Sequence, residues 1–81
     1  MAYNFAIVKE QGVTFAVVCV RESVIRSTFD AQRTRAAFES EYGMPVLLWG
    51  DSNRNVYGRP DLVRFMQRVH VSQIPWRRQT G

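Results

Sequence analysis

The 81-residue sequence contains one cysteine, one histidine and one lysine, and these scarcities exclude several classes of protein. A single cysteine cannot form an internal disulfide, and no signal peptide is recognisable, so we expect a reducing, cytoplasmic location. No apolar run approaches the ~18 residues of a membrane span, so we expect no membrane partner. One histidine and one cysteine cannot build a zinc site without carboxylates or a second chain.

Motifs of catalytic and cofactor-binding sites are also missing. The sequence has no glycine-rich phosphate loop, no nucleophile elbow and no pair of acids at a catalytic spacing. His70 ends a predicted helix and Cys19 lies in an apolar strand, so packing explains both better than chemistry does. We therefore predict no catalytic residue, no metal and no cofactor, identify no small-molecule substrate, and lean against an enzyme.

What the sequence does contain is the composition of one small globular domain. Hydrophobic residues make up 46% and charged residues 22%, which is ordinary for such a domain. The net charge is +4, and ten of the eleven cationic residues are arginine. Arginine binds carboxylates and phosphates through two hydrogen bonds, which permits an acidic partner, although an arginine-rich proteome explains the same bias. We expect one domain over residues 1–76 and a short, frayed, basic tail over residues 77–81.

The strongest strand signal is a hairpin at the N-terminus. Residues 3–9 and 13–20 are rich in β-branched and aromatic side chains, and Gly12 can take the positive φ that a tight turn needs. If a two-residue loop joins the two strands, Lys9 lies opposite Thr14. In this register both faces of the hairpin are apolar.

Two apolar faces are unusual, because a solvated antiparallel sheet alternates apolar with polar residues. Either the chain covers both faces itself, or something else covers the second face. With only two helices predicted, we expect a second copy of the chain there, and therefore a homodimer. The residues assigned to this self-association surface are Val8, Phe15 and Val17.

A first helix is predicted from Ser27 to Tyr42. Ser27 is a candidate N-cap with Asp30 three residues later, and Gly43 is a natural left-handed end. Phe29 lies off the apolar side of this helix. It is either exposed or in an interface, unless Asp30 is the true cap and the helix begins after Phe29.

The second half of the chain repeats the strand and helix pattern. A strand over residues 46–49 follows the first helix, so it can lie parallel to residues 13–20 through a right-handed crossover. Turn-forming residues 51–55 separate it from a short strand at 56–57. Pro60 then opens a helix with a clear apolar stripe, whose members are Leu62, Phe65, Met66 and Val69.

Together these elements predict an α+β fold of ββαββα order. We expect a two-layer sandwich, in which one four-stranded, mostly antiparallel sheet carries two helices on one face. The strand order stays open, because the two hairpins can lie side by side in either orientation. Residues 71–76 read as an extended segment that could add an edge strand.

The function that fits best is a small non-enzymatic binding or assembly module that self-associates through its apolar sheet face. The alternative is a nucleic-acid-binding protein, in which arginines of the second helix and the tail form a basic patch and aromatic rings stack on bases. Interleaved acids and the lack of an RNA-binding signature weigh against the alternative. Its candidate residues are Arg64, Arg68, Trp76, Arg77 and Arg78, with Trp49 and Tyr57 as further stacking candidates. An enzyme would rest only on the polar turn and His70.

Overall fold

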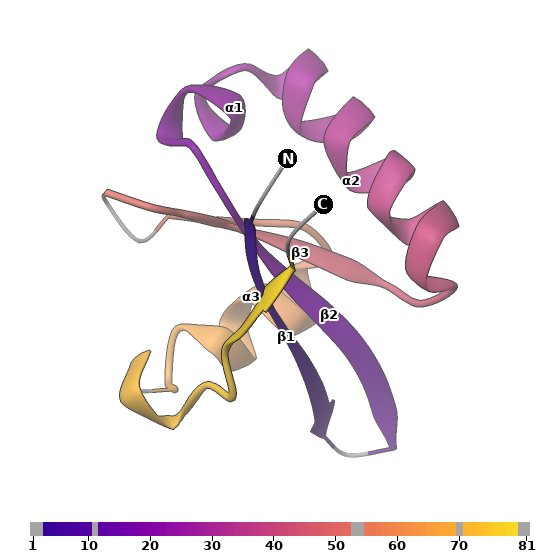
Figure 1. The fold of residues 1–81 in the computed structure, drawn as a ribbon, viewed down its shortest axis with the longest axis vertical. Coiled ribbons are helices and arrows are strands. Elements are labelled where there is room, and N and C mark those ends of the chain that lie inside the picture. The colour runs from indigo at the N-terminus through magenta and orange to yellow at the C-terminus, as the bar shows by residue number, and fades with distance from the viewer. Residues whose placement is uncertain (1–2, 11, 53–54, 70, 80–81) are drawn as a thin grey trace.

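The computed structural model describes residues 3–10, 12–52, 55–69 and 71–79 (Figure 1). Its elements, in chain order, are β1 (Tyr3–Glu10), β2 (Val13–Val20), α1 (Glu22–Arg26), α2 (Thr28–Tyr42), β3 (Val46–Gly50), β4 (Val56–Tyr57), α3 (Pro60–Met66), the 3-10 helix η1 (Val71–Gln73) and β5 (Arg77–Gln79). None of the helices in these described ranges has the length and hydropathy to cross a membrane.

The first hairpin forms in the predicted register. β1 and β2 are antiparallel with Lys9 opposite Thr14, and Gly12 has a φ of 80° in the connecting turn. A residue with a side chain is strained at that φ, so glycine fixes the turn and the turn fixes the register.

The five strands form one mixed sheet in the order β4-β3-β2-β1-β5. β2 and β3 are parallel, as predicted from the helical connection between them, while the other neighbours are antiparallel. The α+β class is therefore confirmed, but the sheet has five strands where four were predicted. A helix, α1, that was not predicted precedes α2.

Local signals correctly located both ends of α2. The Ser27 hydroxyl accepts a hydrogen bond from the Asp30 backbone N–H at 3.3 Å, so Ser27 is the N-cap. Gly43 ends the helix with a φ of 69°, and its N–H donates to the Glu39 carbonyl. Phe29 lies within the helix and is 66% exposed, with the Arg33 guanidinium 5.6 Å above its ring.

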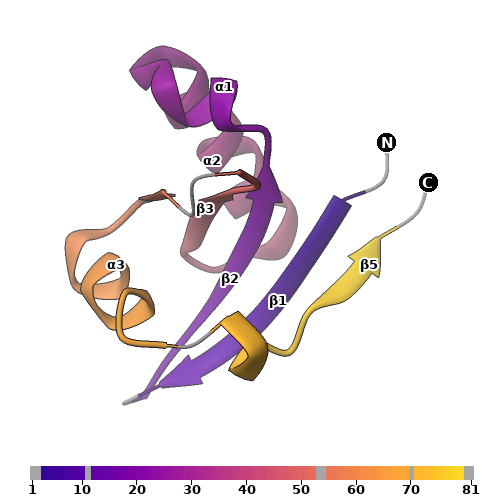
Figure 2. The same cartoon turned by 90° about the vertical axis from the view of Figure 1, so that its left-hand side faces the viewer.

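Helices cover both faces of the sheet. Figures 1 and 2 show α1 and α2 on one side and α3 on the other. The core under α3 contains Ala6, Phe15, Val17, Leu47, Trp49, Leu62, Met66 and Ile74. The core under α1 and α2 contains Ala16, Val18, Ala31, Val46 and Leu48. The prediction of two helices on one face was therefore wrong. Side chains of a strand alternate between faces, and β3 is buried along its whole length, so this sheet needs a cover on each side.

The cover of the second face comes from the same chain. Phe15 and Val17 have no exposed surface, and Val8 is half-buried against the core that contains Leu62 and Met66 of α3. The expectation of a second copy assumed that both helices lie on one face. In the structure, α3 occupies the place that was assigned to the partner.

The C-terminal segment continues the sheet instead of forming a free tail. Arg77 pairs with Phe5 and Arg78 pairs with Asn4, so β5 completes the outer edge of β1. Figure 2 shows β5 alongside β1. Pairing with the edge strand satisfies backbone groups that would otherwise face solvent.

Candidate ligand-binding groove

The parallel strands β2 and β3 bring Cys19, Trp49 and Asp51 together near the ends of the two strands. Cys19 on β2 lies beside Trp49 on β3 in the strand register. Asp51 follows Trp49 by two residues, and its N–H donates to the Val20 carbonyl at 3.0 Å. Trp49 packs in the core on the α3 side of the sheet, and Asp51 lies in the turn that follows β3.

The segment between η1 and β5 supplies a second tryptophan, Trp76, which packs against Trp49. Ile74 is buried in the core, and the Trp76 N–H donates to its carbonyl at 2.8 Å in a tight turn. This turn places the Trp76 ring edge-to-face against Trp49, with 6.0 Å between ring centroids and 76° between ring planes. Trp49 is 5% exposed, whereas Trp76 is half-buried, so Trp76 keeps ring surface that a ligand can contact.

Polar side chains of the β1–β5 pair form the rim. Arg78 lies opposite Asn4, and its Nη1 donates to the Asn4 Oδ1 at 3.3 Å. Arg77 and Arg78 are both exposed. Because Arg78 donates one hydrogen bond to the neutral amide of Asn4, most of the five N–H donors of its guanidinium remain available to bind an anion.

These residues line an open groove of about 390 Å³, which we name the tryptophan groove. It is lined by Asn4, Cys19, Trp49, Asp51, Trp76, Arg77 and Arg78. The volume lies within the roughly 300–1,000 Å³ of small-ligand sites. The groove combines an aromatic floor with a positively charged rim and one carboxylate.

Hydrogen bonds fix the carboxylate of this groove. Asp51 Oδ1 accepts from the Glu22 backbone N–H at 3.3 Å and from the Ser52 hydroxyl at 3.2 Å. Burial, and secondly the negative charge of Asp51, raise the pKa of the Cys19 thiol. The thiol therefore stays protonated at neutral pH and contributes a small apolar surface to the floor, since the thiolate is the nucleophilic form.

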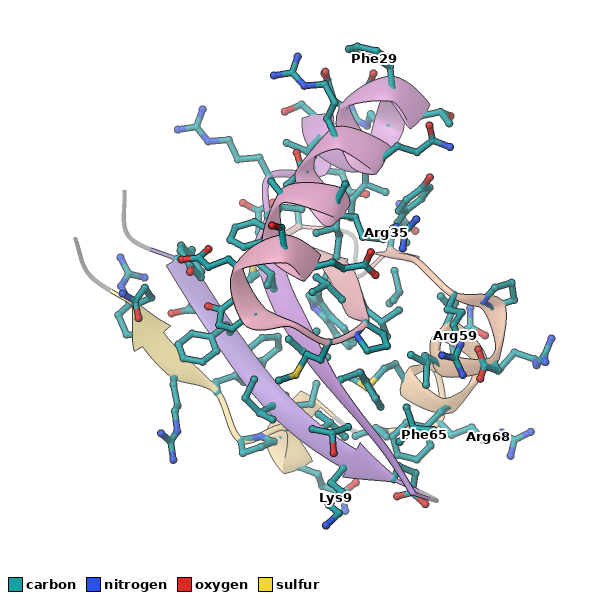
Figure 3. All side chains as sticks on the ribbon, turned by 90° about the vertical axis from the view of Figure 1, so that its right-hand side faces the viewer. Lys9, Phe29, Arg35, Arg59, Phe65 and Arg68 are labelled. Atoms are coloured by element: carbon teal, nitrogen blue, oxygen red, sulfur yellow. The ribbon has the colours of Figure 1, made fainter. Side chains whose placement is uncertain are left out.

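The basic patch expected from the sequence is divided between two ends of the molecule. Arg64 and Arg68 line a separate groove of about 240 Å³ together with Glu10, whereas Arg78 pairs with Asn4. The β1 segment from Asn4 to Glu10 spans about 20 Å. Figure 3 shows Phe65 and Arg68 at the hairpin end of the sheet. Of the residues predicted to bind nucleic acid, Trp49, Trp76, Arg77 and Arg78 share one groove, and Arg64 and Arg68 share the other.

The remaining candidates lie elsewhere. Tyr57 packs against the core under α1 and α2, on the other face of the sheet from the tryptophan groove. His70 lies outside the described residues. Within the ranges that the structure describes, no three histidine, cysteine or acidic side chains cluster to hold a metal ion.

Sequence reasoning missed Asn4 and Cys19 as lining residues and treated Asp51 as a turn former. A signal existed for Cys19 and Asp51, because ligands of α/β sheets bind where parallel strands end. No local signal exists for Asn4, whose place depends on β5, a strand far away in the sequence.

Comparisons with protein-family models, with curated proteins and with solved structures find no match for this chain.

Proposed function

We propose that the protein is a small binding module that holds single-stranded nucleic acid in the tryptophan groove. The observation that carries this proposal is that a half-buried Trp76 ring lines the same groove as the exposed Arg77 and Arg78. Aromatic rings for base stacking next to cations for the backbone are the two parts of sequence-tolerant single-strand binding.

The roles of the residues follow from their exposure. Trp76 offers its ring to a base, and Trp49 supports it from the core by an edge-to-face contact. The guanidinium of Arg78 can bind a phosphate through two hydrogen bonds. The net charge of +4 favours approach of the anionic strand.

Self-association through the sheet face has weaker support. The residues proposed for it include Phe15 and Val17, which have no exposed surface under α3. A dimer at this face would require α3 to leave the sheet, whereas the tryptophan groove is open in the folded chain.

The decisive experiment measures the fluorescence anisotropy of a labelled ten-nucleotide thymidine strand during titration with protein. Double substitution of Arg77 and Arg78 to alanine should weaken binding roughly tenfold at low salt. The matched control substitutes Arg64 and Arg68, which removes the same two positive charges from the other end of the molecule. This control should retain most of the affinity.

Two further measurements separate stacking from simple charge attraction. Trp76→Ala should weaken binding roughly tenfold, since one stacked base contributes about 1–3 kcal/mol; circular dichroism and thermal unfolding will establish that the variant is folded. The logarithm of affinity should fall with the logarithm of salt concentration by about 0.7 per contacted phosphate. Absence of binding at low salt, or equal losses in the two double variants, would contradict the proposal.

A further inference from the structure

Asp51 is the one acidic residue among those that line the tryptophan groove. A carboxylate beside two arginines weakens the attraction for phosphate, so general strand binding does not explain its presence. Asp51 lines this groove together with Trp49 and Trp76. We therefore place a base that stacks on Trp76 against this carboxylate.

Resting on the proposed function, we propose that the groove prefers guanine and that Asp51 reads the pairing edge of this base. Guanine presents two donors side by side on that edge, the N1–H and the N2 amino group. A carboxylate is an acceptor with two oxygens and about four lone-pair sites. Both donors of guanine can therefore hydrogen-bond to one carboxylate.

The other bases match less well. Adenine and cytosine each place one amino donor next to a ring nitrogen that is an acceptor, and this nitrogen repels the carboxylate. Thymine and uracil place one N–H between two carbonyl oxygens. Each of these bases gives Asp51 one good hydrogen bond at most. The preference for guanine therefore arises because guanine offers two adjacent donors and the other bases offer one.

The position of Asp51 is determined before a ligand arrives. Its Oδ1 accepts from the Glu22 backbone N–H at the start of α1 and from Ser52. Both bonds are to Oδ1, so the acceptor sites that remain for the two guanine donors are those of Oδ2, and the two bonds hold the carboxylate in one orientation. A pre-oriented carboxylate loses little freedom on binding, which favours selectivity.

The test compares labelled seven-nucleotide thymidine strands that differ only at the central base. The strand with a central guanine should bind roughly tenfold more tightly than those with adenine, cytosine or thymine, as expected for one bidentate base contact. Central inosine lacks the N2 amino group and should be intermediate. A single guanine per strand avoids four-stranded guanine structures.

Variants then assign the preference to one residue. Asp51→Asn keeps an oxygen for the Glu22 N–H but replaces one acceptor with a donor, so the guanine preference should fall close to one while binding of the all-thymine strand persists. The matched control is Asp61→Asn, which makes the same charge change at the other groove and should keep the preference.

Equal binding of all five strands to the wild-type protein would overturn the assignment and leave strand binding intact. So would a guanine preference that survives in Asp51→Asn. Failure of every strand to bind would instead overturn the proposed function, so the two failures are distinguishable.

Discussion

The carboxylate of Glu22 lies in the space that a side chain at Gly50 would occupy. A Cβ on Gly50 would overlap with Glu22 Oε2 and would be 3.2 Å from the Cδ1 of Ile25. Glu22 is 5% exposed, and its Oε1 accepts a hydrogen bond from the Asn55 side chain. The same residue donates its backbone N–H to Asp51, so this contact joins α1 to the end of β3 next to the tryptophan groove.

Gly50→Ala should destabilise the fold by about 1–3 kcal/mol, because the new methyl group displaces a buried side chain. The loss should be much smaller when Glu22 is also alanine, since the two residues touch and their effects are then not additive. Urea unfolding of the wild type, both single variants and the double variant measures this coupling. If Gly50→Ala lowers the free energy of unfolding equally with Glu22 and with alanine at position 22, the new methyl group clashes with Ile25 and not with Glu22.

Met66→Ala should weaken the cover of the second sheet face. Met66 is 1% exposed in the core under α3, and loss of such a side chain costs about 2–5 kcal/mol. If α3 detaches, Phe15 and Val17 become exposed and the apolar face can bind another copy. Light scattering should give the monomer mass of 9.4 kDa for the wild type and a higher mass for the variant.

An exposed residue of α3 provides the control for this prediction. Arg64→Ala changes the same helix without touching the buried face, so its mass should match the wild type. A wild-type dimer would show that copies associate through a surface other than the one under α3. A monomeric, stable Met66→Ala variant would contradict the role given to this helix.

The stability of the fold should decrease in alkaline solution through Tyr42. Burial, then the hydrogen bond to the Tyr3 hydroxyl at 2.8 Å, raise the pKa of Tyr42 above its ordinary value, and the Glu41 carboxylate adds to the rise. The folded state thus favours the protonated phenol. Its contribution to stability is complete below about pH 10 and is lost as the pH rises above that value.

The ultraviolet absorbance of tyrosinate measures this titration directly. Tyr3→Phe removes the partner hydroxyl and should move the Tyr42 titration toward lower pH. Tyr57→Phe is the matched control, because Tyr57 belongs to β4, at the opposite edge of the sheet from β1 and β5. Unchanged titration in Tyr3→Phe would show that this hydrogen bond does not stabilise the protonated phenol.

Features that depend on neighbours in the sequence were predictable. Gly12 and the two-residue loop set the hairpin register, and Ser27 and Gly43 set the ends of α2. The apolar stripe of α3 was correct from Leu62 to Met66, but the helix ends at Met66, so Val69 packs against the same core from beyond the helix. Each of these features needs only a turn conformation, a cap or a helical repeat, which a short segment determines by itself.

The sequence could not give the side of the sheet on which α3 packs. The apolar stripe of a helix can pack against any apolar sheet face, and β2 and β3 present an apolar face on each side of the sheet. The choice depends on which face α1 and α2 already cover. The error in predicting a two-layer sandwich, and the expectation of a partner that followed from it, both came from this single undetermined choice.

The sequence by itself thus determined the first hairpin, β3 and β4, and both ends of α2, because local hydrogen bonding and side-chain periodicity decide these features. Only the tertiary structure decided that β5 pairs with β1, that Arg64 and Arg68 lie far from Arg78, and that Trp49 meets Trp76 beside Asp51. The physical reason is that contacts between distant segments depend on how all the apolar faces are buried together. The tryptophan groove exists only because that global packing brings Trp76, just before β5, against Trp49 near the end of β3.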